Sequence, residues 1–273
     1  MDREVLKQKL SQLTESEKGG SASVIEELLS YMLPHIGDHD PVLRDKLIYG
    51  LANNWITEGL VSPKMMKDVL EELLTDQYLF KDEKYTRSFA TLWIAALLYQ
   101  HRKEAFLSTA EIEQAFQALL LYIRQETVGE GYGETYGWAH TLAHAADALN
   151  ELILLTELTN NQRLQLVNEI INKMAFPYYV LSHEEDERMT IAVHSALRKG
   201  LAPDMIGSMV KEKALDVIAL WPDVKEANLR MRSNFKQFIR SMYFCFADYS
   251  ALHATLYECE QLFSGIYHQK PSC

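Results

Sequence analysis

Leu107-Ser108-Thr109-Ala110 joins two amphipathic stretches, and similar junctions recur at Leu60-Val61-Ser62-Pro63, Leu158-Thr159-Asn160-Asn161 and Leu201-Ala202-Pro203-Asp204. Successive junctions lie 43 to 51 residues apart, and each contains residues that favour the start of a helix. A single helical hairpin cannot bury its apolar stripe, whereas neighbouring hairpins of the same shape bury it by stacking. The recurrence therefore predicts an all-α fold of about 12 helices, arranged as a right-handed α-solenoid of stacked antiparallel hairpins similar to HEAT or armadillo repeats.

We expect a single domain over residues 1–273. Two helices within 1–35 are predicted to cap the stack, hairpin repeats to fill 40–220, and a helical pair to cover 223–268. The helices between the two ends are predicted at about 41–59, 63–75, 86–101, 109–126, 137–156, 160–175, 186–199 and 203–220. No segment alternates apolar and polar residues with β-branched enrichment, so no β-strand is expected.

Capping signals support these helix boundaries. The polar stretch from Glu15 to Ser21, with Gly19-Gly20, is expected to end the first helix, and Ser23-Val24-Ile25-Glu26 is typical of a capping box that begins the second. Asp40 before Pro41 predicts the next helix start, and Gly59 is suited to its end.

The charge balance argues against a nucleic-acid partner. The chain has 27 basic and 38 acidic side chains, a net charge of -11, and no run of Lys and Arg that forms a basic face. Such a field repels a phosphate backbone.

The sequence predicts a cytoplasmic protein without a membrane partner. Cys245, Cys259 and Cys273 are an odd number without a C-x-x-C motif, which favours a reducing compartment over a disulfide framework. Met1 to Leu10 is charged and unlike a signal peptide. The longest apolar run, Phe89 to Tyr99, is about half the ~20 residues of a membrane span, so we expect a buried helix there.

The segment from Gly137 to Glu151 carries the clearest candidate for chemistry. His140, His144, Asp147 and Glu151 follow at i, i+4, i+7 and i+11, which on a helix places them within an arc of roughly 60°. Two imidazoles and a carboxylate are donors that zinc, manganese or iron accepts. A metal-free polar pocket and histidines that merely bond to neighbouring carboxylates or face solvent remain alternatives.

Arginines begin several of the predicted helices. Arg44, Arg87 and Arg188, together with His140, are expected along one edge of the stack, where guanidinium groups and helix N-termini hold anions. Alternatively, Asp186 and Glu187 pair with these arginines in a ladder that joins the repeats. Ser88 is a candidate nucleophile by residue type alone. Trp93 and Trp138 lie in apolar surroundings and are expected in the core.

Residues 129–137 form the one glycine-rich loop of the sequence. It lacks the Lys-Ser/Thr ending of a phosphate-binding P-loop and follows no strand, which argues against nucleotide binding. We expect its glycines to permit a turn that presses against the next helix, or its tyrosines to form a mobile rim.

Five short motifs resemble the bacterial family catalogued as domain of unknown function 2785. They are Arg44-Asp45-Lys46-Leu47, Trp55-Ile56-x-x-Gly59, Arg87-Ser88-Phe89-Ala90, Gly137-Trp138-Ala139-His140-x-x-Ala143-His144-x-x-Asp147 and Asp186-Glu187-Arg188-Met189. The resemblance spans about Arg44 to Gly200, and its one mild departure is Met189, where leucine is expected. This family has no established activity, so the resemblance implies a fold and the position of a site but no reaction.

We therefore predict a cytoplasmic α-solenoid that binds a protein or a small polar or anionic ligand along its concave face. The residues expected near the ligand are Arg87, Ser88, Trp138, His140, His144, Asp147, Asp186 and Arg188. The alternative is a metal-dependent, hydrolytic enzyme in which His140, His144 and Asp147 hold the ion and Glu151 or Glu187 is the base. A third possibility is that the whole polar set is structural.

Overall fold

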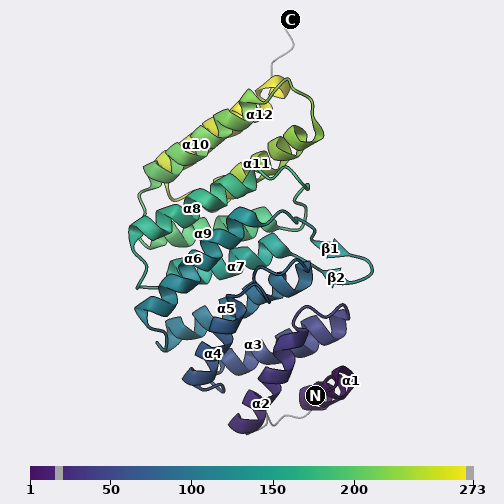
Figure 1. Ribbon diagram of the computed structural model, residues 1–273. Coiled ribbons are helices and arrows are strands. Elements are labelled where there is room, and N and C mark those ends of the chain that lie inside the picture. Colours follow the sequence, from purple (N-terminus) through teal and green to yellow (C-terminus); the bar gives the residue numbers. More distant parts are fainter. Residues whose placement is uncertain (16–20, 269–273) are drawn as a thin grey trace, which may run out of the picture.

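The computed structural model describes residues 1–15 and 21–268, and its helices follow one another in chain order along the molecule (Figure 1). The described residues form α1 (Arg3–Glu15), α2 (Ala22–Met32), α3 (Gly50–Thr57), α4 (Pro63–Leu73), α5 (Lys84–Lys103), α6 (Thr109–Gln125), α7 (Thr141–Leu154), α8 (Asn160–Met174), α9 (Glu185–Arg198), α10 (Pro203–Ala219), α11 (Glu226–Cys245) and α12 (Ser250–His268). A short 3-10 helix (Leu33–His35), a π-helix (Val42–Tyr49) and two strands, β1 (Tyr132–Gly133) and β2 (Gly137–Trp138), complete the fold. The prediction of an all-helical chain is confirmed.

The helices pack in two rows. One row consists of α3, α5, α7, α9 and α11, each in contact with the next; the other consists of α6, α8, α10 and α12 (Figure 1). Buried apolar side chains from Leu6 to Phe263 form one connected core between them. Within α5 the run from Phe89 to Leu98 is buried throughout, which confirms the prediction of a buried helix there. No helix in the described part of the chain has the length and apolarity that crossing a bilayer requires.

Several predicted caps are present. Ser108 and Glu111 form a reciprocal capping box at the start of α6, and the Ser62 hydroxyl accepts a hydrogen bond from the Met65 amide at the start of α4. Gly59 and Gly200 follow their helices with φ of 72° and 97°, the left-handed conformation that glycine adopts without a steric penalty. The capping hydrogen bonds of Ser108 and Ser62 join residues three positions apart in the sequence.

Near the N-terminus the predicted helix starts differ from those in the structure. The capping box at Ser23 is wrong, because α2 already begins at Ala22. Asp40 does cap its helix, with Oδ1 accepting from the Val42 amide, but the helix begins as the π-helix that precedes α3. The expected helix end at Gly19-Gly20, like Cys273, lies outside the described residues; of the other cysteines, Cys245 is exposed and Cys259 buried.

The helix predicted from Gly137 begins only at Thr141. Gly137 has φ of 70° and pairs with Gly133 in a small antiparallel hairpin, so the prediction without strands is wrong here. The amides of Ala139 and His140 donate to the carbonyls of Gly131 and Glu130. These bonds hold the segment before α7 against the hairpin and leave His140 at the N-cap of the helix.

Candidate functional site

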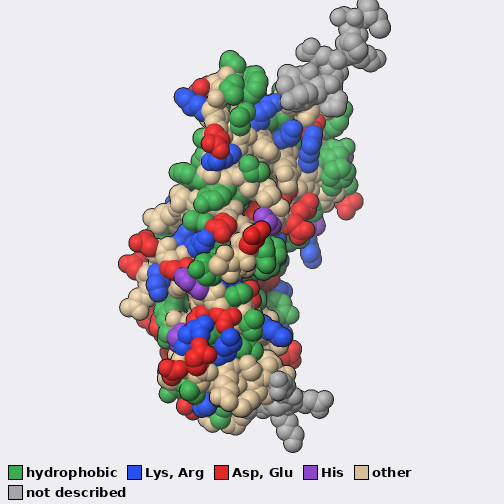
Figure 2. Space-filling view, turned by 90° about the vertical axis from the view of Figure 1, so that its right-hand side faces the viewer, with side chains coloured by type: hydrophobic (Ala, Val, Ile, Leu, Met, Phe, Trp, Pro, Cys, Tyr) green, Lys and Arg blue, Asp and Glu red, His purple; other side chains and the backbone are tan. Residues whose placement is uncertain are grey.

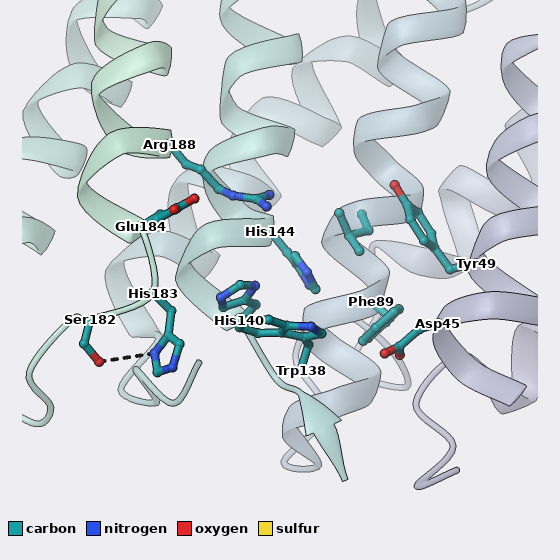
Figure 3. Close-up of a pocket in the computed structure, with 11 residues that line it drawn as sticks. Asp45, Tyr49, Phe89, Trp138, His140, His144, Ser182, His183, Glu184 and Arg188 are labelled. Carbon is teal, nitrogen blue, oxygen red and sulfur yellow. Dashed lines mark hydrogen bonds between the residues drawn. The ribbon is translucent and has the colours of Figure 1, made fainter. Parts of the chain in front are cut away.

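A cavity of about 580 Å³ lies between the N-terminal ends of α7 and α9, the side of α5 and the π-helix (Figure 3). It is lined by Asp45, Tyr49, Phe89, Leu92, Trp138, His140, His144, Ser182, His183, Glu184 and Arg188. Its volume is within the range of small-molecule sites in proteins. The face of the molecule that carries the hairpin mixes acidic, basic and histidine side chains (Figure 2).

Two residues of this cavity have a strained backbone. His140 and Glu184, with φ of 47° and 66°, are the non-glycine residues with positive φ in the described ranges. They are the N-cap residues of α7 and α9, and both line the cavity. Such conformations cost roughly 1 to 3 kcal/mol and cluster at functional sites, so their joint occurrence here marks the cavity as the candidate site.

His140 is a buried, neutral histidine. Its residue is 8% exposed, and its Nε2 has no hydrogen-bond partner within residues 1–15 and 21–268. Its ring packs against the Trp138 indole, tilted by 31°, at a centroid distance of 4.2 Å (Figure 3). Burial, together with the charges of Arg188 and His183, lowers the pKa of His140 to about 4. The imidazole is therefore unprotonated at neutral pH.

Ser88 fixes the orientation of the second imidazole. Its hydroxyl donates to the Ala139 carbonyl and lies 2.8 Å from Nδ1 of His144. A hydroxyl has one hydrogen, so Ser88 Oγ accepts the hydrogen bond from Nδ1–H of His144. Burial lowers the pKa of His144 well below its ordinary value. The fully buried Ser88 thus orients a neutral imidazole, and its hydroxyl is not exposed in the cavity.

Arg188 supplies the positive charge of the cavity. It is the one Lys or Arg among the described lining residues. Its Nη1 donates to Asp147 Oδ2 at 2.6 Å, and no further hydrogen bond joins its guanidinium to the described part of the protein. Burial raises the pKa of Asp147, although Arg188 opposes this shift. Asp147 itself lines an adjoining cavity of about 450 Å³, which shares Tyr49 and Leu92 with the first.

Four predicted residues lie elsewhere. Arg87 pairs with Glu126 of the C-terminal end of α6, and Asp186 accepts a hydrogen bond from Ser241 at 2.5 Å. Glu151 pairs with Arg102, and Glu187 is exposed and does not line the cavity. Arginines and carboxylates do pair between elements, as the ladder hypothesis predicts, but Asp186 and Glu187 are not the partners. Trp138 also differs from expectation, since it is 40% exposed at the cavity rather than buried in the core.

The glycine-rich loop reaches the cavity by close packing against the segment before α9. A side chain at Gly131 would lie 2.3 Å from the ring of His183. The expectation of a close-packed turn is right, but its partner is this loop rather than the next helix. His183 is thereby held with its ring 6.0 Å from that of His140.

Asn234 holds the segment before α9, and no sequence pattern indicated this role. Its buried amide accepts from the Leu181 amide and donates to the carbonyls of Phe176 and Tyr179, at 2.8 to 2.9 Å. Asn234 belongs to α11, more than fifty residues along the chain, so only the tertiary structure brings it to this loop.

The three predicted metal ligands do not all lie together. His140 and His144 lie together with ring centroids 5.6 Å apart, while Asp147 is engaged by Arg188. Across the described residues, no group of three or more His, Cys, Asp and Glu side chains is arranged to hold a metal ion. A metal site at these residues stays a prediction.

Acid is expected to destabilise the protein through His140. Its pKa falls from 6.5 to about 4 on folding, so between these values the unfolded chain binds more protons and stability decreases as the pH falls. From pH 7 to pH 5, this one group is expected to remove about 2 kcal/mol of the free energy of unfolding, measured by urea denaturation. His140→Asn, which suits the left-handed backbone, should reduce this pH dependence. An unchanged dependence would contradict the assignment.

Comparison with known proteins places the chain in a family context. A family model described as "Protein of unknown function (DUF2785)" matches residues 68–244, more than half of the 273 residues. The match includes Trp138, His140, His144 and Arg188 but not Asp45 and Tyr49. No curated protein and no solved structure matches the chain.

Proposed function

The chain belongs to the DUF2785 family, and we propose that it binds a small anionic organic ligand in the cavity between the starts of α7 and α9. The observation that carries the proposal is the buried, unpartnered Nε2 of His140 beside the partly engaged guanidinium of Arg188. A buried polar atom without a partner costs roughly 1 to 3 kcal/mol. A ligand that donates a hydrogen bond to it removes this cost.

The lining favours an organic anion over a simple ion. Arg188 has donors left for a carboxylate, because Asp147 accepts only from its Nη1. Phe89, Leu92 and Trp138 provide apolar walls on which a carbon skeleton can pack. The cavity has the size of a small-molecule site, which favours a small ligand over a folded protein as the occupant.

The finer architecture and the location are part of this proposal. We propose that the two rows of helices form a right-handed α-solenoid of the HEAT-like type, with the cavity on its concave face; the successive contacts α3–α5–α7–α9–α11 support it. We also propose a cytoplasmic location, which the free thiols of Cys245 and Cys259 support.

Arg188→Gln is expected to weaken binding of a carboxylate at least about tenfold, because a charge-assisted hydrogen bond contributes roughly 1.5 to 3 kcal/mol. The measurement is titration calorimetry with benzoate, cyclohexanecarboxylate and D-glucuronate. Arg102→Gln is the matched control, since Arg102 is similarly exposed and also pairs with a carboxylate of α7 but lies outside the cavity. Equal losses in both variants, or no binding by any of the three acids, would contradict the proposal.

A metal-dependent hydrolase is the second candidate, and one observation favours it. His144 directs Nδ1–H to Ser88 and so leaves Nε2 able to ligate, the arrangement that holds a metal-ligating imidazole. Metal analysis of protein purified without a histidine tag tests this candidate. Stoichiometric zinc, manganese or iron that is lost in the His140→Ala, His144→Ala double variant would favour the enzyme.

A further inference from the structure

The two imidazoles of the cavity offer nitrogens for hydrogen bonding. His144 uses Nδ1–H toward Ser88, so its neutral ring has a lone pair on Nε2. Nε2 of His140 is buried without a partner in the described residues, and a hydroxyl group pairs with it in either tautomer because a hydroxyl both donates and accepts. The two rings are neighbours, with centroids 5.6 Å apart.

The charges around these nitrogens favour neutral donors over cationic ones. The charge of Arg188 lowers the pKa of both histidines, and that of Arg44 lowers the pKa of His144 as well, so a further cation beside the rings is disfavoured. Of the lining carboxylates, Asp45 is paired with Arg44 and Glu184 is exposed to solvent. A hydroxyl group donates to an imidazole nitrogen without bringing a second positive charge beside Arg188, whereas an ammonium group does bring one.

A carboxylate is the anionic group that best suits the charge of the cavity. The one guanidinium of the cavity already pairs with Asp147, so it balances a single negative charge better than the two charges of a phosphate dianion. The walls formed by Phe89 and Trp138 are aromatic, and the C–H face of a sugar ring packs on such surfaces.

We propose that the ligand is a sugar acid, whose carboxylate pairs with Arg188 while its hydroxyls form hydrogen bonds with Nε2 of His140 and of His144. Its carbon ring packs against Trp138. This inference specifies the ligand of the proposed binding function and rests on it.

Titration calorimetry with three probes tests the inference. D-glucuronate has both the carboxylate and the hydroxyls, cyclohexanecarboxylate lacks the hydroxyls, and D-glucose lacks the carboxylate. We expect D-glucuronate to bind at least about ten times more tightly than either, because each of the other probes loses one set of bonds. His140→Asn should reduce the preference for D-glucuronate over cyclohexanecarboxylate at least about threefold. His253→Asn, outside the cavity, should leave it unchanged.

The outcomes separate the inference from the function on which it rests. If cyclohexanecarboxylate binds as tightly as D-glucuronate, the sugar-acid inference is overturned while an anion-binding cavity stands. If D-glucose binds as tightly as D-glucuronate, the role of Arg188 is overturned. If neither acid binds, both the proposed function and the inference fail. The comparison of probes on the unmodified protein remains decisive even if His140→Asn does not fold.

Discussion

Replacing Arg44 by methionine is expected to lower the free energy of unfolding by about 3 to 5 kcal/mol. The side chain is fully buried, and its guanidinium donates to the carbonyls of Asp38 and Tyr136 at 2.8 and 2.7 Å and to Asp45 Oδ1 at 2.7 Å. It also lies 4.5 Å from the ring centroid of Tyr85. Methionine fills much of the volume but donates no hydrogen bond. The carbonyls of Asp38 and Tyr136 and, at 3.4 Å, that of Trp138 therefore lose this donor, and the Asp45 carboxylate loses its charge partner.

Urea unfolding followed by circular dichroism measures this effect. Arg240→Met is the control, because Arg240 pairs with a carboxylate at an exposed position and such pairs contribute at most about 1 kcal/mol. A loss below about 1 kcal/mol in Arg44→Met would show that the burial of this guanidinium is not stabilising.

Arg44 also positions the segment that forms one wall of the candidate cavity. By donating to Tyr136 it ties the hairpin of β1 and β2 to the π-helix, and its Nη2 lies 3.5 Å from where a side chain at Gly137 would begin. Trp138 follows directly and forms a wall of the cavity. The variant should therefore weaken D-glucuronate binding as well as stability, if the cavity is the site.

The hydrogen bond between Arg44 and Tyr136 shows why the start of α7 could not be predicted from the sequence. The spacing of His140 and His144 correctly indicated that the two rings lie together, yet it assumed a helix from Gly137. The hydrogen bonds of the hairpin and the contact with Arg44, over ninety residues away, override that local pattern. Helix starts such as Ser108 were predicted correctly because their hydrogen bonds close within four residues.

Other parts of the site also depend on tertiary packing rather than on local sequence. Tyr49, Phe89 and His183 line the cavity from three elements, and each is an ordinary residue in its own segment. Their convergence depends on how the π-helix, α5 and the loop before α9 are packed, which no local pattern encodes. The strained backbone of Glu184 was equally hidden, because an acidic run at a helix start is common without strain.

Arg87→Met is expected to lower the free energy of unfolding by about 3 to 5 kcal/mol while leaving ligand binding intact. Glu126 has a side chain only 1% exposed and accepts from Arg87 Nε at 2.7 Å, from Arg87 Nη2 at 2.9 Å and from the Tyr122 hydroxyl at 2.9 Å. Burial raises the pKa of Glu126, but the hydrogen bonds and charge of Arg87 outweigh it and hold the pKa below its ordinary value. The carboxylate therefore stabilises the fold above the pKa of the unfolded chain, and this contribution is lost as the pH falls.

A double variant separates a structural role for Arg87 from a role in ligand binding. Glu126→Gln combined with Arg87→Met removes the unpaired charge, so it should be more stable than Arg87→Met alone by urea unfolding. Both variants should bind D-glucuronate as the unmodified protein does, because Arg87 does not line the cavity between α7 and α9. If Arg87→Met instead keeps its stability and loses affinity for D-glucuronate, Arg87 belongs to the ligand site and its pairing with Glu126 is secondary. If stability is lost while the affinity for D-glucuronate is retained, Arg87 has a structural role and links α5 to the C-terminal end of α6.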